Sequence, residues 1–246
     1  MNETVFTPIK HLGFCCLCEK EVIFRADGPY FRATLRCPEC NTGPRHRHIF
    51  HALNKFVPNW KSKDIHESSP GWDPVSTHLS KGAKSYLATQ WDPSIPFGTM
   101  HAKGYRSEDL QCQTFADNSF DIVVAQDVFE HIFRPDLAIK EIARTLRPNG
   151  VFIATVPIIL RWEDTRRRAS LIDGKVVHHL PAEYHGNPLT NDGSLVTIDW
   201  NFDIVSYLQH HSGLSFILLQ TENIDLGIRG VHAEVLVGIK KPLPNI

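Results

Sequence analysis

The clearest hydrophobic pattern in this chain lies between residues 120 and 157. Ile122–Ala125 is a short, continuously apolar run rich in β-branched residues, which predicts a parallel strand buried on both faces. Apolar side chains then recur at helical spacing from Leu137 to Leu146, and Pro148-Asn149-Gly150 ends the helical pattern. A second apolar strand follows at Val151–Pro157. Together these elements predict one right-handed βαβ unit.

Further patterns extend this unit toward both ends of the chain. Each is a short apolar run or an amphipathic stretch bounded by Gly, Pro or polar turn residues. The predicted elements are a first strand with its loop at residues 63–71, a second strand at Ser85–Thr89, a loop at Pro93–Gly104, a helix at Asp203–His211 and two terminal strands at Leu214–Leu219 and Ala233–Lys240. This alternation predicts an α/β fold.

Five of the six cysteines lie in the first forty residues, which is not typical of an enzyme core. Cys15-x-x-Cys18 and Cys37-x-x-Cys40 have the spacing of a four-thiolate zinc site, in which each pair offers two sulfurs to one ion. We therefore expect a structural Zn²⁺ ion. Disulfide bonds are the alternative, but a secreted chain would be expected to carry a leader.

The segment between the two cysteine pairs predicts a β-hairpin. Val22–Phe24 and Tyr30–Arg32 flank the turn Asp27-Gly28-Pro29, so the module resembles a zinc ribbon. Cys16 is then a spare free thiol, because its neighbour Cys15 already occupies a ligand position. Cys112 stands alone later in the chain, and we expect it to be a packing residue.

An amphipathic segment that runs from Gly43 to near Pro58 predicts a helix that connects two modules. The first module spans residues 1–60, and a larger domain spans residues 61–246. Arg45 and Arg47 are either solvated or clamp the small module to the large one. A third hypothesis is that one of them faces a cofactor carboxylate or an anionic substrate.

Residues 108–157 carry a resemblance to a known family. Asp109-Leu110 is followed by the polar turn Asp117–Asp121 and by a strand that ends at Gln126-Asp127. This arrangement resembles the second half of the S-adenosylmethionine-dependent methyltransferases with the Rossmann-like fold. The resemblance extends over roughly residues 63–241. It implies a doubly wound, mostly parallel seven-stranded sheet with an antiparallel terminal strand, whereas the alternative is an ordinary βαβ repeat without a cofactor.

The resemblance also implies which residues hold S-adenosylmethionine. In the family, the pair that matches Asp109 and Leu110 holds the adenine, and Gln126 lies at the carboxyl end of a strand, where ligands bind. The methionine side falls to Glu67, Ser68 and Ser69, although this chain has Ser-Ser-Pro-Gly where the family has a glycine-rich turn. The family's ribose-binding acid is replaced by Gln90-Trp91-Asp92, from which we expect Gln90 and Trp91 to contact the cofactor.

The expected catalytic groups follow the fifth strand. His185 lies beside Glu183 and Tyr184 in a polar insertion, and imidazoles exchange protons near neutral pH. We assign it to proton removal or substrate orientation, with Asp127 or His131 as substitutes. The alternative for this segment is a rigid turn. Arg166–Arg168 reads as a solvated helix face or, alternatively, as a site for a phosphate-bearing substrate.

These observations predict a methyltransferase that acts on an oxygen or nitrogen of a small molecule, such as a sugar or a secondary-metabolite intermediate. One rival is an RNA methyltransferase, because residues 1–62 hold nine Lys/Arg against five Asp/Glu. The other rival is a non-catalytic binding module, favoured by the unusual cofactor loop. The sequence carries no signal for the oligomeric state.

Composition and charge argue against several classes of protein. The formal net charge of −1 argues against a general nucleic-acid coat protein. No apolar run reaches membrane-spanning length, and the start Met-Asn-Glu-Thr lacks the features of a signal peptide. We therefore expect a cytoplasmic protein without a membrane partner.

Overall fold

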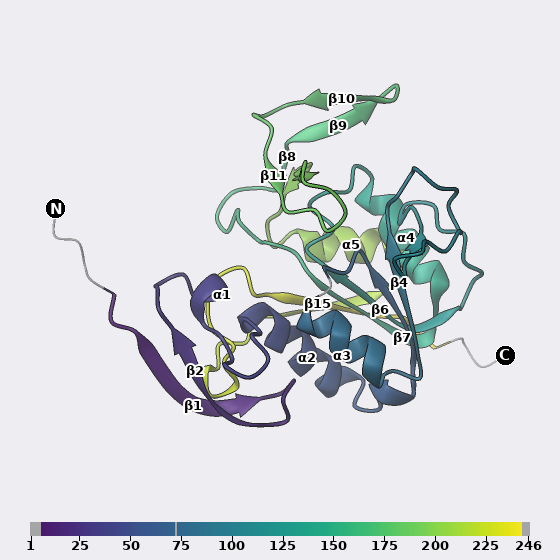
Figure 1. The fold of residues 1–246 in the computed structure, drawn as a ribbon. Helices are drawn as coiled ribbons and strands as arrows, with labels where there is room; N and C mark the ends of the chain where they lie inside the picture. The colour runs from purple at the N-terminus through teal and green to yellow at the C-terminus, as the bar shows by residue number, and fades with distance from the viewer. Residues whose placement is uncertain (1–5, 72, 243–246) are drawn as a thin grey trace.

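The centre of the computed structural model, which describes residues 6–71 and 73–242, is a seven-stranded sheet covered by helices on both faces (Figure 1). Across the sheet the strands are β14 (Ser215–Leu219), β15 (Val235–Ile239), β7 (Leu146–Thr155), β6 (Phe120–Gln126), β3 (Asp64–Ser68), β4 (Ser85–Gln90) and β5 (Arg106–Ser107). Only β15 runs antiparallel to its two neighbours. The predicted fold class, a Rossmann-like seven-stranded sheet with an antiparallel terminal strand, is confirmed.

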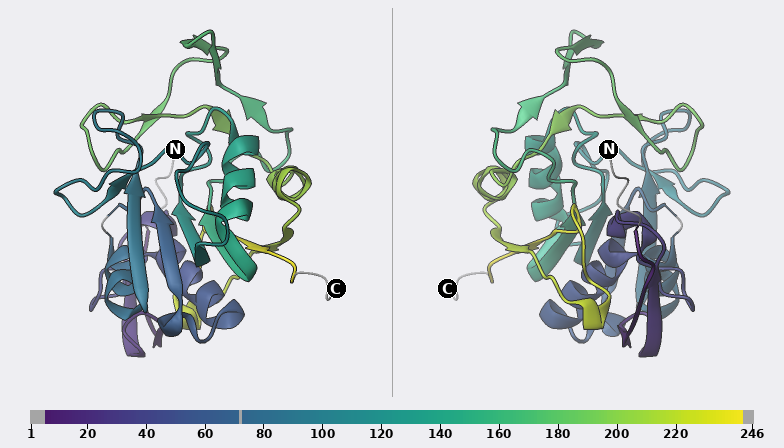
Figure 2. Two further views of the ribbon diagram at one scale, coloured as in Figure 1. Left: turned by 90° about the vertical axis from the view of Figure 1, so that its right-hand side faces the viewer. Right: turned by 90° about the vertical axis from the view of Figure 1, so that its left-hand side faces the viewer.

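The sheet separates two hydrophobic cores. Helices α2 (Pro44–Phe56) and α3 (Pro74–Gly82) cover one face, and α4 (Pro135–Thr145) and α5 (Ile204–Ser212) cover the other (Figures 1 and 2). Strand β6 supplies both cores, because Ile122 and Val124 point to one face while Val123 and Ala125 point to the other. The continuously apolar sequence of this strand follows from that double burial.

Helix α4 ends at Thr145, one residue before the last apolar position of the sequence pattern. Leu146 already has an extended conformation with ψ of 138°, and Pro148-Asn149-Gly150 belongs to β7 instead of stopping the helix. The strand starts early because Leu146 pairs with Phe120 across an irregularity in the ladder between β6 and β7. The expected βαβ unit is present with this shorter helix.

The N-terminal hairpin differs from the predicted one. Strands β1 (Ile9–Cys15) and β2 (Lys20–Ala26) pair antiparallel around the first cysteine pair. The second predicted strand, Tyr30–Arg32, is wrong, because Phe31–Thr34 forms the short helix α1. The Thr34 hydroxyl donates to the carbonyl oxygens of Gly28 at 2.7 Å and Tyr30 at 3.1 Å, which holds the turn in its helical form.

The cysteine module and the sheet share one continuous core. Cys15 and Phe24 belong to the same buried cluster as Ile65 and Val235. A short 3-10 helix, η1 (Trp60–Ser62), lies near the predicted boundary between residues 1–60 and 61–246, and the Trp60 ring belongs to the same cluster. The boundary therefore separates two segments of chain that pack together, and the division into two domains stays a proposal.

An insertion between β7 and α5 consists of small antiparallel pairs. These are β8 (Arg166–Arg167) with β13 (Ile198–Asp199), β9 (Ala169–Ile172) with β10 (Lys175–His178), and β11 (Tyr184–His185) with β12 (Ser194–Leu195). The β9–β10 hairpin projects away from the sheet (Figures 1 and 2). The interpretation of Arg166–Arg168 as a solvated helix face is wrong. Arg166–Arg167 forms strand β8, and Arg166 and Arg168 are ion-paired with buried Asp199 at 3.0 and 2.8 Å. A second 3-10 helix, η2 (Ile224–Leu226), precedes β15.

No helix among the described residues combines the length and the apolar character needed to cross a membrane. The expectation about a leader rests on Met1–Thr4, which lie outside the described residues.

Candidate functional site

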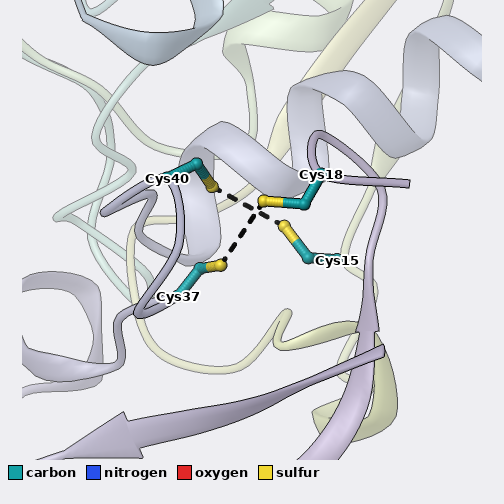
Figure 3. A group of neighbouring side chains, drawn as sticks. All are labelled: Cys15, Cys18, Cys37 and Cys40. Atoms are coloured by element: carbon teal, nitrogen blue, oxygen red, sulfur yellow. Dashed lines mark hydrogen bonds between the residues drawn. The ribbon is translucent and has the colours of Figure 1, made fainter. Parts of the chain in front are cut away.

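Four cysteine side chains converge between the β1–β2 turn and the loop before α2 (Figure 3). The Sγ atoms of Cys15 and Cys40 are 3.7 Å apart, as are those of Cys18 and Cys37. A tetrahedral zinc with bonds of about 2.3 Å requires sulfur atoms about 3.8 Å apart. A disulfide would need about 2.05 Å. The geometry therefore fits a metal ion, and all six cysteines are free thiols.

The members of the cluster differ in how readily they lose a proton: hydrogen bonding and burial raise the pKa of Cys15, and burial raises that of Cys18 to about 12, whereas Cys40 is favoured as a thiolate. The Thr42 hydroxyl lies 3.0 Å from the Cys40 sulfur, and hydrogen bonding from Cys15 and Thr42 lowers the pKa of Cys40. Cys16 stays outside the cluster, as expected: its thiol donates to the Arg47 carbonyl oxygen at 3.4 Å, and burial raises its pKa to about 12.

Cys112 is exposed, so the expectation that it is a packing residue is wrong. It follows the tight backbone turn from Asp109, whose carbonyl oxygen accepts from the Cys112 N–H at 3.0 Å.

Arg47 anchors this module to the rest of the chain. Its guanidinium is fully buried and donates to the carbonyl oxygens of Leu35, Thr42 and Gly227, with Leu35 at 3.0 Å. It also lies 4.6 Å from the centre of the Phe24 ring. Burial lowers the pKa of Arg47 to about 10. Of the interpretations of Arg47, the clamp is therefore confirmed.

The loop that follows β3 has the features of a cofactor-binding turn. Ser69 adopts a φ of 53°, an uncommon conformation for a residue with a side chain, and its N–H donates to the Thr89 carbonyl oxygen at 2.7 Å. A side chain added at Gly71 would meet nothing within 4 Å, so the loop borders open space. Asp73 then caps α3 by accepting from the N–H of Val75 at 2.8 Å.

Glu67 lies beneath this loop with both carboxylate oxygens engaged. Gln126 and Ser76 donate to Oε1 at 2.8 and 3.0 Å, and the Tyr86 hydroxyl donates to Oε2 at 2.7 Å. Burial raises the pKa of Glu67 to about 7. The position of Glu67 thus supports the loop, and its assignment to the methionine side, with Ser68 and Ser69, stays a prediction.

The end of β4 borders the same loop. Gln90 is buried and its Nε2 donates to the Pro70 carbonyl oxygen at 2.9 Å, which ties β4 to the turn. Trp91 is 61% exposed and is free to lie against a ligand. Asp92 is committed to its own loop, since Ser94 and the Tyr105 hydroxyl both donate to it. The ribose assignments of Gln90 and Trp91 stay predictions.

Asp109 and Leu110 follow β5 at the same edge of the sheet. The Asp109 Oδ1 oxygen accepts from the backbone N–H of Gln111 at 2.8 Å and from its side-chain amide at 3.0 Å. Oδ2 makes no hydrogen bond within residues 6–71 and 73–242, which leaves it available to a ligand's amino group. Leu110 is buried against the core of α4. This arrangement is compatible with the predicted adenine contact.

Asp127, directly after β6, contacts residues of the cysteine module. It adopts a φ of 51° and accepts from the Thr155 hydroxyl at 2.8 Å through Oδ1. Its Oδ2 pairs with Arg32 at 2.6 Å and also with Arg45. Both carboxylate oxygens of Asp127 are therefore engaged within the protein, one of them by two cations from the cysteine module.

Glu130, His131 and His185 form a compact group next to Asp127. Their ligand atoms lie within 4.8 Å of one another, and the two imidazole rings meet edge to face with centroids 5.2 Å apart. The Glu130 Oε1 atom is 3.8 Å from His131 Nε2 and 4.0 Å from His185 Nδ1. The other nitrogen of His185 lies 3.5 Å from Glu183. This spacing allows proton exchange and would also accommodate a divalent cation.

Glu130 is the unusual member of this group. It is 2% exposed, burial raises its pKa to about 7, and within the described part of the chain no other residue donates a hydrogen bond to its carboxylate oxygens. A buried polar group without partners costs about 1–3 kcal/mol, so its presence calls for a function. His131 donates through Nδ1 to the Leu195 carbonyl oxygen at 2.9 Å, which fixes its ring. Since a carbonyl only accepts, Nδ1 carries the proton and Nε2 faces Glu130 with its lone pair.

The sequence indicated most of these residues but missed Arg32. It placed Arg32 in a strand, whereas the residue belongs to α1 and reaches Asp127, 95 positions later. Nothing in the local pattern identifies such a contact. The sequence does carry one local signal for this group, because Glu130 and His131 are polar residues that a βαβ unit does not need.

Comparison with known proteins agrees with this fold. A family model described as a methyltransferase domain matches residues 75–154. The fold is similar to that of an S-adenosylmethionine-dependent methyltransferase from Mesorhizobium loti, with a TM-score of 0.52 and 12% identity over 78% of this chain and 98% of that chain. It is also similar to DesVI from Streptomyces venezuelae, with a TM-score of 0.50 and 14% identity over 80% of this chain and 92% of that chain.

A third similar chain comes from the complex between the Haloferax volcanii Trm112 methyltransferase activator and a methyltransferase. It has a TM-score of 0.50 and 15% identity over 82% of this chain and 92% of that chain. At these identities the structural similarity establishes the fold. Together with the family match, it supports a methyltransferase that depends on S-adenosylmethionine.

Proposed function

We propose that this protein transfers a methyl group from S-adenosylmethionine to an oxygen or nitrogen atom of a small molecule. The observation that carries the proposal is the convergence of Glu130, His131 and His185 at the carboxyl edge of the parallel sheet, beside the loops expected to hold the cofactor. In sheets of this kind ligands bind at that edge. The cofactor would supply an activated methyl group on a positively charged sulfur.

The cofactor side is formed by loops from three strands. Ser68 and Ser69 follow β3, Gln90 and Trp91 end β4, and Asp109 follows β5. Open space at Gly71 and the free Oδ2 oxygen of Asp109 support this assignment. Glu67 acts from below by holding Gln126 and Tyr86, so its role is to position the loop.

The acceptor side carries the proton chemistry. His185 is partly exposed and lies between Glu130 and Glu183, so it can take the proton of an acceptor hydroxyl and share the resulting charge with two carboxylates. His131 is held by Leu195 and presents Nε2 toward the same space. Asp127 is bound to Arg32 and Arg45 and serves to hold the cysteine module over the site.

The cations of the cysteine module favour a small acceptor over RNA. Arg32 and Arg45 are paired with Asp127, and Arg47 is buried. Lys20 and Lys61 are paired with Glu39 and Glu19. The two lysine–glutamate pairs leave the surplus of positive charge in residues 1–62 unchanged, but Arg32, Arg45 and Arg47 are engaged within the protein, which reduces the number of cations available for phosphate contacts.

A structural zinc bound by Cys15, Cys18, Cys37 and Cys40 belongs to this proposal. The sulfur spacing of 3.7 Å supports it. Four thiolates and Zn²⁺ carry a net charge of about −2. Arg47, whose nearest ionisable neighbours include Cys15 and Cys37, lies where it offsets part of that charge.

Calorimetric titration with S-adenosylhomocysteine tests the cofactor assignment. We expect one binding site per chain. Methyl transfer is then measured from labelled S-adenosylmethionine to a set of small hydroxyl and amine compounds and, in parallel, to structured RNA. Absence of cofactor binding would favour the non-catalytic alternative, and salt-sensitive methylation of RNA alone would favour the RNA alternative. Repeating the assay with and without added divalent cation separates proton transfer by His185 from metal-assisted chemistry.

A further inference from the structure

We propose that a cavity lined by Arg32, Arg36 and Arg45 is an anion-binding site for a carboxylate or phosphate group that takes part in the reaction. The cavity has a volume of about 230 Å³ and is lined by Tyr30, Arg32, Ala33, Arg36, Gly43, Arg45 and His46. A water molecule occupies about 30 Å³, so an oxyanion fits together with several waters. The inference rests on the proposed function because it assigns the anion to a reactant.

The lining of this cavity is entirely basic or neutral. It contains three arginines and a histidine, and it contains no carboxylate. Arg32 and Arg45 share the carboxylate of Asp127 in direct contact, while Glu130 acts on both of them from a greater distance. Arg36 bonds only to backbone carbonyl oxygens, those of Ala33 at 2.8 Å and Asn41 at 3.2 Å. The charged side chains that line the cavity are therefore all cationic, which suits an anion at this place.

A hydrogen-bond donor without a partner also indicates that the cavity binds an anion. The Nη1 nitrogen of Arg32 is buried and has no hydrogen-bond partner within residues 6–71 and 73–242. A buried, charged donor without a partner is costly, and a planar guanidinium fork matches the two oxygens of a carboxylate or phosphate. Burial and the neighbouring Arg32 lower the pKa of Arg45 to about 10, which an adjacent anion would reverse.

The cavity borders both halves of the reaction site. His46 accepts from the Gly43 N–H at 3.2 Å through Nδ1, and its Nε2 lies 3.3 Å from Asp73, which caps the helix after the cofactor loop. On the other side, Arg32 and Arg45 reach Asp127, which leads into Glu130 and His131. The anion could therefore come from the methionine end of the cofactor or from the acceptor.

Inorganic phosphate is the probe for the first test. We expect calorimetric titration to detect one phosphate per chain in sodium chloride of matched ionic strength. Arg36→Ala should weaken this binding about ten-fold or more, because it removes a hydrogen bond to a charged group without touching Asp127. Arg32→Lys should weaken it as well, since lysine keeps the charge but loses the planar fork.

Arg25→Ala is the matched control. Arg25 is exposed on β2 of the same module and does not line the cavity. Phosphate affinity should be unchanged in this variant. Equal losses in Arg25→Ala and Arg36→Ala would mean diffuse attraction to a basic surface and would overturn the proposal, as would a wild-type protein that binds no phosphate. Thermal unfolding of each variant confirms that the fold is retained.

A second titration identifies the source of the anion. If the cofactor's carboxylate enters the cavity, S-adenosylhomocysteine should displace phosphate. The Arg36→Ala variant should then bind S-adenosylhomocysteine more weakly, but its affinity for 5′-methylthioadenosine, which lacks the carboxylate, should be unchanged. If the acceptor's anion enters it, phosphate should still bind to protein saturated with S-adenosylhomocysteine. Because no turnover is required, failure of phosphate binding is distinguishable from failure of the methyltransferase assignment.

Discussion

Glu67 and Glu130 are two buried glutamates at the same edge of the sheet, and burial raises the pKa of each to about 7. Glu67, on the cofactor side, receives three hydrogen bonds from Ser76, Tyr86 and Gln126. Glu130, on the acceptor side, receives none from any other described residue. A satisfied buried carboxylate holds its surroundings in place, whereas an unsatisfied one is poised to act on something that binds. The difference divides the site into a supporting half and a reacting half.

Removal of the proposed zinc should have the largest effect, and this effect should be strongest in the cysteine module and, through Asp127, in the reacting half. A structural zinc contributes about 10–16 kcal/mol of apparent binding free energy. Cys37→Ser should abolish zinc binding and the fold of residues 9–42, so that Arg32 and Arg45 leave Asp127 and turnover is lost. Elemental analysis and amide hydrogen exchange measure this, and protection should persist around Glu67.

Cys112→Ser is the control, because Cys112 is the exposed cysteine outside the cluster. Its zinc content should remain about one ion per chain. A native protein without zinc, or one with a disulfide between Cys15 and Cys40, would contradict the assignment.

Replacement of His185 tests the reacting half directly. With a hydroxyl acceptor, His185→Ala should lower turnover by about 10²–10⁴ and leave the affinity for S-adenosylhomocysteine nearly unchanged, because a general base acts on the acceptor. Single-turnover kinetics and calorimetry measure the two quantities. His178→Ala, on the exposed strand β10, is the matched control. Near-normal turnover in His185→Ala would shift the role to His131 or Asp127.

Glu67, in the supporting half, should make the free energy of unfolding depend on pH. Burial raises the folded-state pKa of Glu67 to about 7 from its ordinary value of 4.5, so the folded protein binds the proton more tightly than the unfolded chain. Stability is therefore lost as pH rises from about 4.5 to 7, by up to about 3 kcal/mol. Glu67→Gln should remove this loss and become the more stable protein near pH 8. Urea unfolding at several pH values checks it, and parallel curves for both proteins would refute the protonation argument.

Asp109 should have a smaller effect, confined to cofactor binding. Asp109→Ala should weaken the binding free energy of S-adenosylmethionine by about 1.5–3 kcal/mol, which is the range for loss of a hydrogen bond to a charged group. Calorimetry measures this, with exposed Asp164→Ala as the control. Unchanged affinity in a folded Asp109→Ala protein would place the adenine elsewhere and would weaken the division of the site.

Local patterns predicted those parts of the molecule that depend on neighbouring residues. Ile122–Ala125 is a buried strand because it is apolar on both faces, and the spacing of Cys15, Cys18, Cys37 and Cys40 brings four sulfurs together. The wrong prediction of a strand at Tyr30–Arg32 also came from a local pattern. Its β-forming composition is overridden by the hydrogen bonds of Thr34, which only the folded turn displays.

Contacts between distant segments could not be predicted in this way. Asp127 looked like a free carboxylate, yet Arg32 and Arg45 bind it from a module about 80 to 95 residues earlier. Glu130 stood out as a polar residue, but its lack of partners depends on how β12 and the insertion close around it. Long-range pairing and burial are properties of the assembled fold, and they decide which carboxylate reacts.

The clamp made by Arg47 has a consequence for how the chain is synthesised. Its guanidinium bonds to Gly227, 180 positions later, as well as to the loop between the cysteine pairs. The N-terminal module therefore cannot complete its packing until almost the whole chain has left the ribosome. The proposed zinc ion would stabilise the module during that interval, so we expect zinc depletion during synthesis to lower the yield of folded protein.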